Sequence, residues 1–190
     1  MANSKIKRKY PKYVEKVYFE QDQIEIGIQK AAKWIDINYK NKTPILVAVL
    51  KGAIPFYGNL LTKIKVDVIC DFIVMSSFKG QIVAQSKPEI VTDLISDIKQ
   101  QHIVVIEDIV DTGRSMKVLK KWLIEKGAKS VKVISLVDKP EARKVKFDVD
   151  YKCFDVPGNA FLIGYGLDFK EKCRNLPYIA ELNKKYINSF

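Results

Sequence analysis

The chain has 190 residues, of which 47% are hydrophobic, so it is long enough for one folded domain and too apolar to be disordered. Its net charge of +11 raises the question of a nucleic-acid partner, but the lysines cluster only between Lys5 and Lys12, and we do not expect nucleic acid to bind. No apolar stretch follows the basic N-terminus, the longest apolar run (45–50) is too short to cross a membrane, and the three cysteines lack metal-type spacing. We therefore expect one cytoplasmic domain without a membrane segment.

The first 40 residues predict a short strand over 14–19 and then an amphipathic helix. Asp22 and Glu25 have the spacing of a capping box, which would start a helix over 23–39. Apolar residues at helical spacing define the inward face of this helix, which consists of Ile24, Ile28, Ala31, Ile35 and Tyr39.

The next segment predicts a buried strand, a glycine turn and a short helix. The apolar run Ile45–Leu50 leads directly into Lys51 and Gly52. Pro55 suits the first turn of a helix that reaches Leu61.

Alternating residues over 66–75 predict a strand with one partly polar face. Residues 76–87 have no periodicity and are typical of a mobile loop or a two-stranded flap. A strand over 89–94 is expected to return from this segment.

Residues 102–115 carry the strongest functional signal in the chain. The β-branched residues 103–106 predict a strand buried on both faces, and Glu107 and Asp108 follow it directly. The loop 111–115, rich in small and polar residues, then leads into a helix.

This order of elements is the layout of a phosphate site at the carboxyl edge of a parallel sheet, where loop amides and a helix N-terminus can face an anion. Two adjacent carboxylates suit either a hydrated Mg²⁺ or the hydroxyls of a ribose, so a sugar phosphate explains the whole stretch. Because residues 45–61 repeat the order of strand, glycine turn and helix, we expect the two loops to meet at one edge of the sheet.

The rest of the chain predicts one more helix and several short strands, with no domain boundary. A helix from 116 to 127 is expected, followed by strands over 130–137, 151–156 and 161–165. The inward face of this helix is predicted to contain Val118, Leu119, Trp122 and Leu123.

Three other phosphate-handling sites do not fit. A Walker loop needs Gly-Lys-Ser/Thr at a helix start, and a dinucleotide site needs G-x-G-x-x-G, of which the chain has only Gly164-Tyr-Gly166. An aspartyl phosphatase would place two aspartates one residue apart, whereas Asp108 and Asp111 are three apart.

The string E-D-I-V-D-T-G-R-S resembles the phosphoribosyl-pyrophosphate (PRPP) signature of the type I phosphoribosyltransferases, and V-D-T-G most resembles the hypoxanthine-guanine branch. The resemblance extends over about 45–178. It implies an α/β fold, the type I phosphoribosyltransferase fold, with a mostly parallel twisted sheet flanked by helices, a flexible loop and a small hood. It also implies a single domain over 1–190, with a core at about 40–140 and a hood from about 1–20 and 145–190.

The resemblance also implies roles for particular residues. Asp111 would be the catalytic base, and Leu50–Lys51 is predicted to be a cis peptide. PRPP and its phosphate would contact Glu107, Asp108, Ile109, Asp111, Thr112, Gly113, Arg114 and Ser115. Pyrophosphate would contact Lys51, Gly52, Ser77, Phe78 and Arg174, although Phe78 replaces the usual tyrosine. The purine would contact Lys139, Phe161, Leu162 and Asp168, and the Mg²⁺ ligands would be Glu107, Asp108 and Asp168.

The implied activity is transfer of 5-phosphoribosyl from PRPP to N9 of hypoxanthine and/or guanine, giving IMP or GMP and pyrophosphate in a homodimer or homotetramer. Two alternatives stay open: a xanthine-preferring enzyme, and an RNA-binding regulator with the same fold. Such regulators resemble the chain less well, because a tyrosine typically takes the place of Asp111.

Overall fold

The computed structural model describes residues 10–76 and 88–189, and its centre is a six-stranded sheet. Its strands are β2 (Ile45–Leu50), β3 (Ile69–Ser76), β4 (Glu89–Ile90), β5 (His102–Val110), β6 (Ser130–Asp138) and β7 (Tyr151–Asp155). Their spatial order is β4-β3-β2-β5-β6-β7, and every neighbouring pair is parallel except β4 with β3. The expected α/β architecture with a mostly parallel sheet is confirmed, while most of the expected flap lies outside the described residues.

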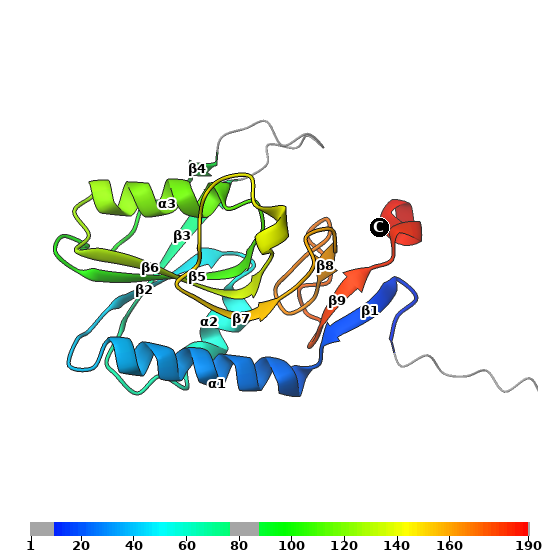
Figure 1. Cartoon of the computed structure of the whole chain (residues 1–190), viewed down its shortest axis with the longest axis horizontal. Coiled ribbons are helices and arrows are strands. Elements are labelled where there is room, and N and C mark those ends of the chain that lie inside the picture. The colour runs from blue at the N-terminus through cyan, green and yellow to red at the C-terminus, as the bar shows by residue number, and fades with distance from the viewer. Residues whose placement is uncertain (1–9, 77–87, 190) are drawn as a thin grey trace, which may run out of the picture.

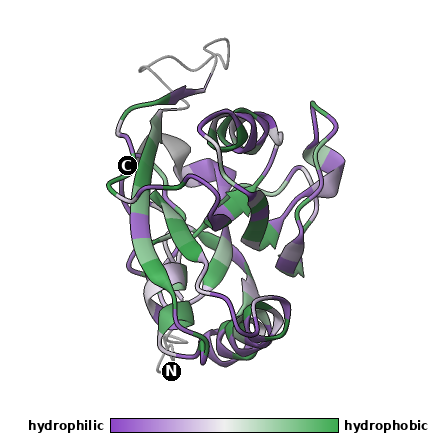
Figure 2. Ribbon diagram, turned by 90° about the vertical axis from the view of Figure 1, so that its left-hand side faces the viewer, coloured by the Kyte–Doolittle hydropathy of each residue, from purple (hydrophilic) through white to green (hydrophobic). Residues whose placement is uncertain are grey.

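Helices cover both faces of this sheet (Figure 1). α1 (Gln21–Asn38) and α2 (Ile54–Leu61) pack on one face, and α3 (Arg114–Glu125) packs on the other. The strands between them are largely hydrophobic (Figure 2), as expected for strands that are buried on both faces. In β5, Val104 and Ile106 contact the α1 side, whereas Ile103 and Val105 contact the α3 side.

The inward face predicted for α1 is confirmed, since all five of its predicted residues are buried. The predicted capping box is wrong. The helix begins two residues earlier than expected, with Glu20 as its N-cap, and the Gln23 side chain accepts a hydrogen bond of 2.9 Å from the Glu20 backbone N–H. Asp22 therefore lies inside the first turn, where a carboxylate interacts favourably with the helix dipole.

In α3 the buried positions are Met116, Leu119 and Leu123, which are spaced three and four residues apart. The prediction that Val118 faces inward is wrong, because its side chain is 37% exposed. The helix begins at Arg114, earlier than expected, so Met116 already lies within its first turn and takes the inward position.

The strand β3 begins three residues later than predicted, and its partly polar face is the buried one. Asp71 and Ile73 are buried, whereas Phe72 is 46% exposed and contacts the Tyr57 ring at 5.4 Å between ring centres. Buried Asp71 accepts a 2.8 Å hydrogen bond from the Ser96 backbone N–H. The returning strand is shorter than predicted, since β4 contains two residues.

A second, three-stranded sheet lies beside the carboxyl edge of the first (Figure 1) and has the order β1-β9-β8. Its strands are β1 (Val14–Phe19), β8 (Leu162–Ile163) and β9 (Ile179–Leu182). β9 was not predicted, and its partner β1 comes from the other end of the chain. Two short 3-10 helices, η1 (Pro140–Ala142) and η2 (Lys184–Ser189), complete the described elements.

The chain direction across the sheet changes between β2 and β5. From β2 the chain passes through α2 to β3 on one side, whereas from β5 it passes through α3 to β6 on the other side. Loops that leave two adjacent parallel strands in opposite directions open a crevice at the carboxyl edge, which is where open α/β sheets bind ligands. Within the described residues, no helix combines the length and hydrophobicity that a membrane span needs.

Candidate active site

The carboxylates of Glu107 and Asp108 lie near the carboxyl end of β5. Atom Oε2 of Glu107 is buried and has no hydrogen-bond partner within residues 10–76 and 88–189. Burial raises the pKa of Glu107 well above its usual value, and the neighbouring Asp108 raises it further. Burial also raises the pKa of Asp108 to about 6, although the backbone N–H of Ile109 and the guanidinium of Arg174 lower it. Two such carboxylates are costly unless a cation or hydroxyl donors bind them.

The two loops that were expected to meet come together at Gly52 and Asp108. A Cβ atom on Gly52 would lie 1.7 Å from Oδ2 of Asp108, so any larger residue would force this carboxylate or the loop to move. On the other side, a Cβ atom on Gly166 would lie 2.0 Å from the carbonyl oxygen of Gly52. The Leu50–Lys51 peptide is cis, as predicted. Three segments that are distant in sequence therefore converge here.

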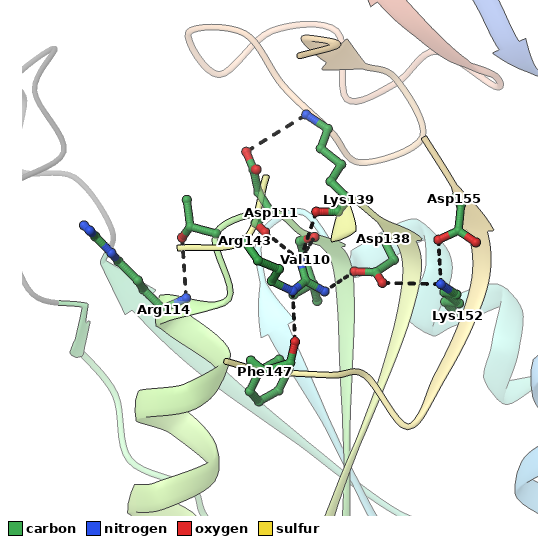
Figure 3. Close-up of polar contacts among 10 residues, drawn as sticks. Val110, Asp111, Arg114, Asp138, Lys139, Arg143, Phe147, Lys152 and Asp155 are labelled. Atoms are coloured by element: carbon green, nitrogen blue, oxygen red, sulfur yellow. Dashed lines mark hydrogen bonds and ion pairs between the residues drawn. The ribbon is translucent and has the colours of Figure 1, made fainter. Parts of the chain in front are cut away.

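The loop between β5 and α3 turns at Gly113, whose φ of +78° lies in the left-handed region and which forms the N-cap of α3. The carbonyl of Thr112 accepts a 3.0 Å hydrogen bond from the Lys144 backbone N–H, which fixes the loop from outside. The Arg114 side chain points away from Asp111 (Figure 3). Loop amides and the N-terminus of α3 are the groups that this turn can offer to an anion.

Lys139 and Asp111 face each other beside this loop, with Nζ and Oδ2 4.0 Å apart (Figure 3). The Lys139 side chain is buried and donates a hydrogen bond of 2.5 Å to the carbonyl oxygen of Ala160. Burial lowers the pKa of Lys139, while the charges of Asp111 and Glu181 raise it. The Asp111 carboxylate is 51% exposed, so a ligand can reach it.

Sequence reasoning did not identify Arg143, which connects the loop to Lys139 (Figure 3). Its guanidinium donates to the carbonyl oxygens of Val110 at 2.7 Å, Asp111 at 2.5 Å and Lys139 at 3.3 Å. It also forms an ion pair with buried Asp138. Nothing in the local sequence pattern distinguishes this arginine, because most of its partners are backbone carbonyls that the fold brings to it.

Lys51 and Arg174 are brought to the same region, and one carboxylate, that of Glu171, binds both. Lys51 Nζ lies 2.7 Å from one Glu171 oxygen, and Arg174 Nη2 lies 3.0 Å from the other. Asp168 forms an ion pair with the same Arg174 nitrogen at 2.8 Å. The predictions included Lys51, Arg174 and Asp168 but not Glu171.

Phe161 and Leu162 lie where β8 begins, and they differ in exposure. Phe161 is 44% exposed and contacts Phe169 edge to face, with ring centres 5.5 Å apart, whereas Leu162 is buried. An exposed ring at this edge is available to stack on a flat ligand. Ser77 and Phe78, which were predicted to contact pyrophosphate, lie outside the described residues.

The acidic groups suit a divalent cation that keeps much of its own water. Within the described parts of the chain, no three His, Cys, Asp or Glu side chains gather closely enough to enclose a metal. Mg²⁺ is commonly bound by one or two carboxylates together with substrate phosphates, so a complete protein cage is not needed. The unpartnered Oε2 of Glu107 and the raised pKa of Asp108 fit such an ion.

Comparison with known proteins gives consistent matches over most of the chain. Residues 16–170 match the model of the phosphoribosyl transferase domain. The chain is 41% identical over 172 residues to the hypoxanthine-guanine phosphoribosyltransferase of Streptococcus pneumoniae, covering 90% of this chain and 95% of that protein. It is 40% identical over 166 residues to the protein of the same name from Mycoplasma genitalium, covering 87% and 94%.

A solved structure agrees with these sequence matches. The crystal structure of a hypoxanthine phosphoribosyltransferase from Staphylococcus aureus superposes with a TM-score of 0.86 at 30% identity. The superposition covers 91% of this chain and 94% of that one.

Proposed function

The chain belongs to the phosphoribosyltransferase family and is an enzyme of its hypoxanthine-guanine branch, and we propose how its site performs that reaction. The substrates are PRPP and a 6-oxopurine, hypoxanthine and/or guanine. The C1–oxygen bond to pyrophosphate breaks, a bond from C1 to N9 of the purine forms, and IMP or GMP and pyrophosphate leave. The buried, unpartnered carboxylate oxygen of Glu107 beside Asp108 is the observation that carries this proposal.

The sugar phosphate is held by β5 and the turn that follows it. Glu107 and Asp108 bind the ribose hydroxyls, and the amides of 111–115 hold the 5′-phosphate, to which the hydroxyls of Thr112 and Ser115 can also donate. Glu107 and Asp108, with Asp168 as a further contact, would hold Mg²⁺, which would neutralise charge on the pyrophosphate. These residues fix the orientation of C1 toward the base.

The purine is held between the two sheets. Lys139 is buried and close to Asp111, so its ammonium group can donate to the 6-oxo group of the base. The exposed Phe161 ring stacks on the base, and the backbone at Leu162 reads its edge. Asp111 takes the proton at N7, which shifts electron density toward the attacking N9.

Lys51 and Arg174 bind the negative charge that develops on the leaving pyrophosphate. The backbone at Gly52, and Ser77 and Phe78 of the segment 77–87, supply further contacts to it. The transition state has oxocarbenium character at C1, so water must be kept from it. One domain performs these steps, with the sheet β1-β9-β8 as its hood. Assembly as a homodimer or homotetramer, which the resemblance implies, is part of this proposal.

A pyrophosphate-release assay with PRPP, Mg²⁺ and one purine base at a time tests the proposal. We expect release with hypoxanthine or guanine, and none with adenine, without base, or with the metal chelated. Release with xanthine alone would favour the xanthine-preferring alternative. Retention of RNA in a filter-binding assay without turnover of any base would overturn the enzyme assignment.

A further inference from the structure

The two cations assigned to pyrophosphate are already bound by an acid of the chain itself. Glu171 presents one oxygen to Lys51 Nζ at 2.7 Å and the other to Arg174 Nη2 at 3.0 Å. Lys51 and Glu171 are 120 positions apart in sequence, so this contact connects two of the converging segments. Two carboxylate oxygens that bridge an ammonium and a guanidinium make the same kind of contacts that a phosphate group would make there.

The local backbone holds Glu171 in this place without burying it. Its N–H donates a 2.9 Å hydrogen bond to Oδ2 of Asp168, and Lys170 and Glu171 both have positive φ, at 50° and 64°. Arg174 is held independently by the carbonyl oxygen of Gly166, at 2.8 Å. The Glu171 side chain is 63% exposed, so it can swing into solvent while Arg174 stays in position through Gly166 and its 2.8 Å ion pair with Asp168.

We propose that the Glu171 carboxylate is an internal substitute for pyrophosphate. It binds Lys51 and Arg174 until PRPP displaces it, and it returns to them as pyrophosphate leaves. Glu171 thereby sets the affinity of the site for PRPP and for released pyrophosphate. This inference rests on the proposed function, since it uses the assignment of both cations to the pyrophosphate group. No step of the reaction described above uses Glu171, and this inference gives it a role in product release.

The size of the effect follows from the exposure of the contacts. Ion pairs between solvent-exposed groups are weak, so the two contacts of Glu171 compete with a ligand for the same cations by roughly a factor of five. The site thus gives up a modest amount of affinity, and in return the cations remain neutralised between turnovers. Pyrophosphate must then compete with the returning carboxylate to rebind.

The test is Glu171→Gln, which keeps the shape of the side chain and removes its charge. We expect the dissociation constant of pyrophosphate, measured by calorimetry, and the KM for PRPP each to fall about fivefold. The matched control is Glu125→Gln on α3, which removes an exposed acid paired with Lys121 at 3.6 Å and should change neither value. Circular dichroism establishes that both variants are folded.

The outcomes separate this inference from the proposed function. If the wild-type protein binds neither pyrophosphate nor PRPP, the proposed function fails. If it binds both and Glu171→Gln binds them equally well, Glu171 is a spectator and this inference alone is overturned. Weaker binding by Glu171→Gln would also overturn it, because the carboxylate would then assist the ligand instead of competing with it.

Discussion

Replacing Gly52 by alanine tests whether the loop after β2 and the carboxylates after β5 form one site. The added Cβ atom would lie 1.7 Å from Oδ2 of Asp108, whereas real Cβ contacts are at least 3.0 Å, so the loop or the carboxylate must move by about 1.3 Å. A misplacement of about 1 Å in a catalytic site can lower the rate about 100-fold. We therefore expect Gly52→Ala to lower kcat/KM for PRPP by roughly that factor.

The matched control is Gly58→Ala in α2, where a Cβ atom would meet nothing within 4 Å. Alanine is the better helix former, so this variant should be more stable by about 0.5–1 kcal/mol and retain the wild-type kcat/KM. Initial rates of pyrophosphate release and thermal melts measure both quantities. A Gly52→Ala enzyme with wild-type kcat/KM would refute the placement of Asp108 against this loop as a catalytic requirement.

Four further substitutions probe single groups of the site. Asp111→Asn should lower kcat by roughly 10²–10⁴ while PRPP binding survives, and wild-type turnover would refute its role as the base. Lys139→Ala should weaken binding of the purine but not of PRPP, and equal losses measured by calorimetry would show that the lysine is structural. Arg143→Lys replaces a guanidinium, whose Nη1 contacts backbone carbonyls while its Nη2 contacts Asp138, by a single ammonium nitrogen that cannot span both sets of partners. We therefore expect kcat to fall more than the KM for PRPP rises; proportional changes in both would contradict this positioning role. The raised pKa of Asp108 means that the folded state disfavours its ionised form, so the free energy of unfolding falls as pH rises from about 4 to about 6. Asp108→Asn should therefore recover about 3 kcal/mol of that free energy near neutral pH in metal-free buffer. If the gain in Tm of Asp108→Asn over the wild type does not become smaller as pH is lowered toward about 4, the stated pH dependence is wrong.

The elements with strong local patterns were predictable from the sequence. The β-branched run at the start of β5 and the helical spacing in α1 both place apolar residues where the fold buries them. The strand–turn–helix repeat also predicted that the loops at Gly52 and Asp108 would meet, because parallel strands end at a common edge.

The features that sequence reasoning missed depend on partners far away in the chain. β9 is a strand because β1 pairs with it from the opposite end of the chain. Asp71 can be buried because a distant backbone N–H, that of Ser96, donates to it. The contacts of Arg143 and Glu171 were missed because the fold brings carbonyls or cations to these side chains, and no local periodicity records such contacts.

A crystal structure of the enzyme with GMP and Mg²⁺ tests the central arrangement most directly. We expect the 5′-phosphate on the amides of 111–115, the ribose hydroxyls on Glu107 and Asp108, and the guanine between Phe161 and Lys139. A nucleotide bound with its phosphate elsewhere, and with both carboxylates out of contact with the ribose and the metal, would contradict the account.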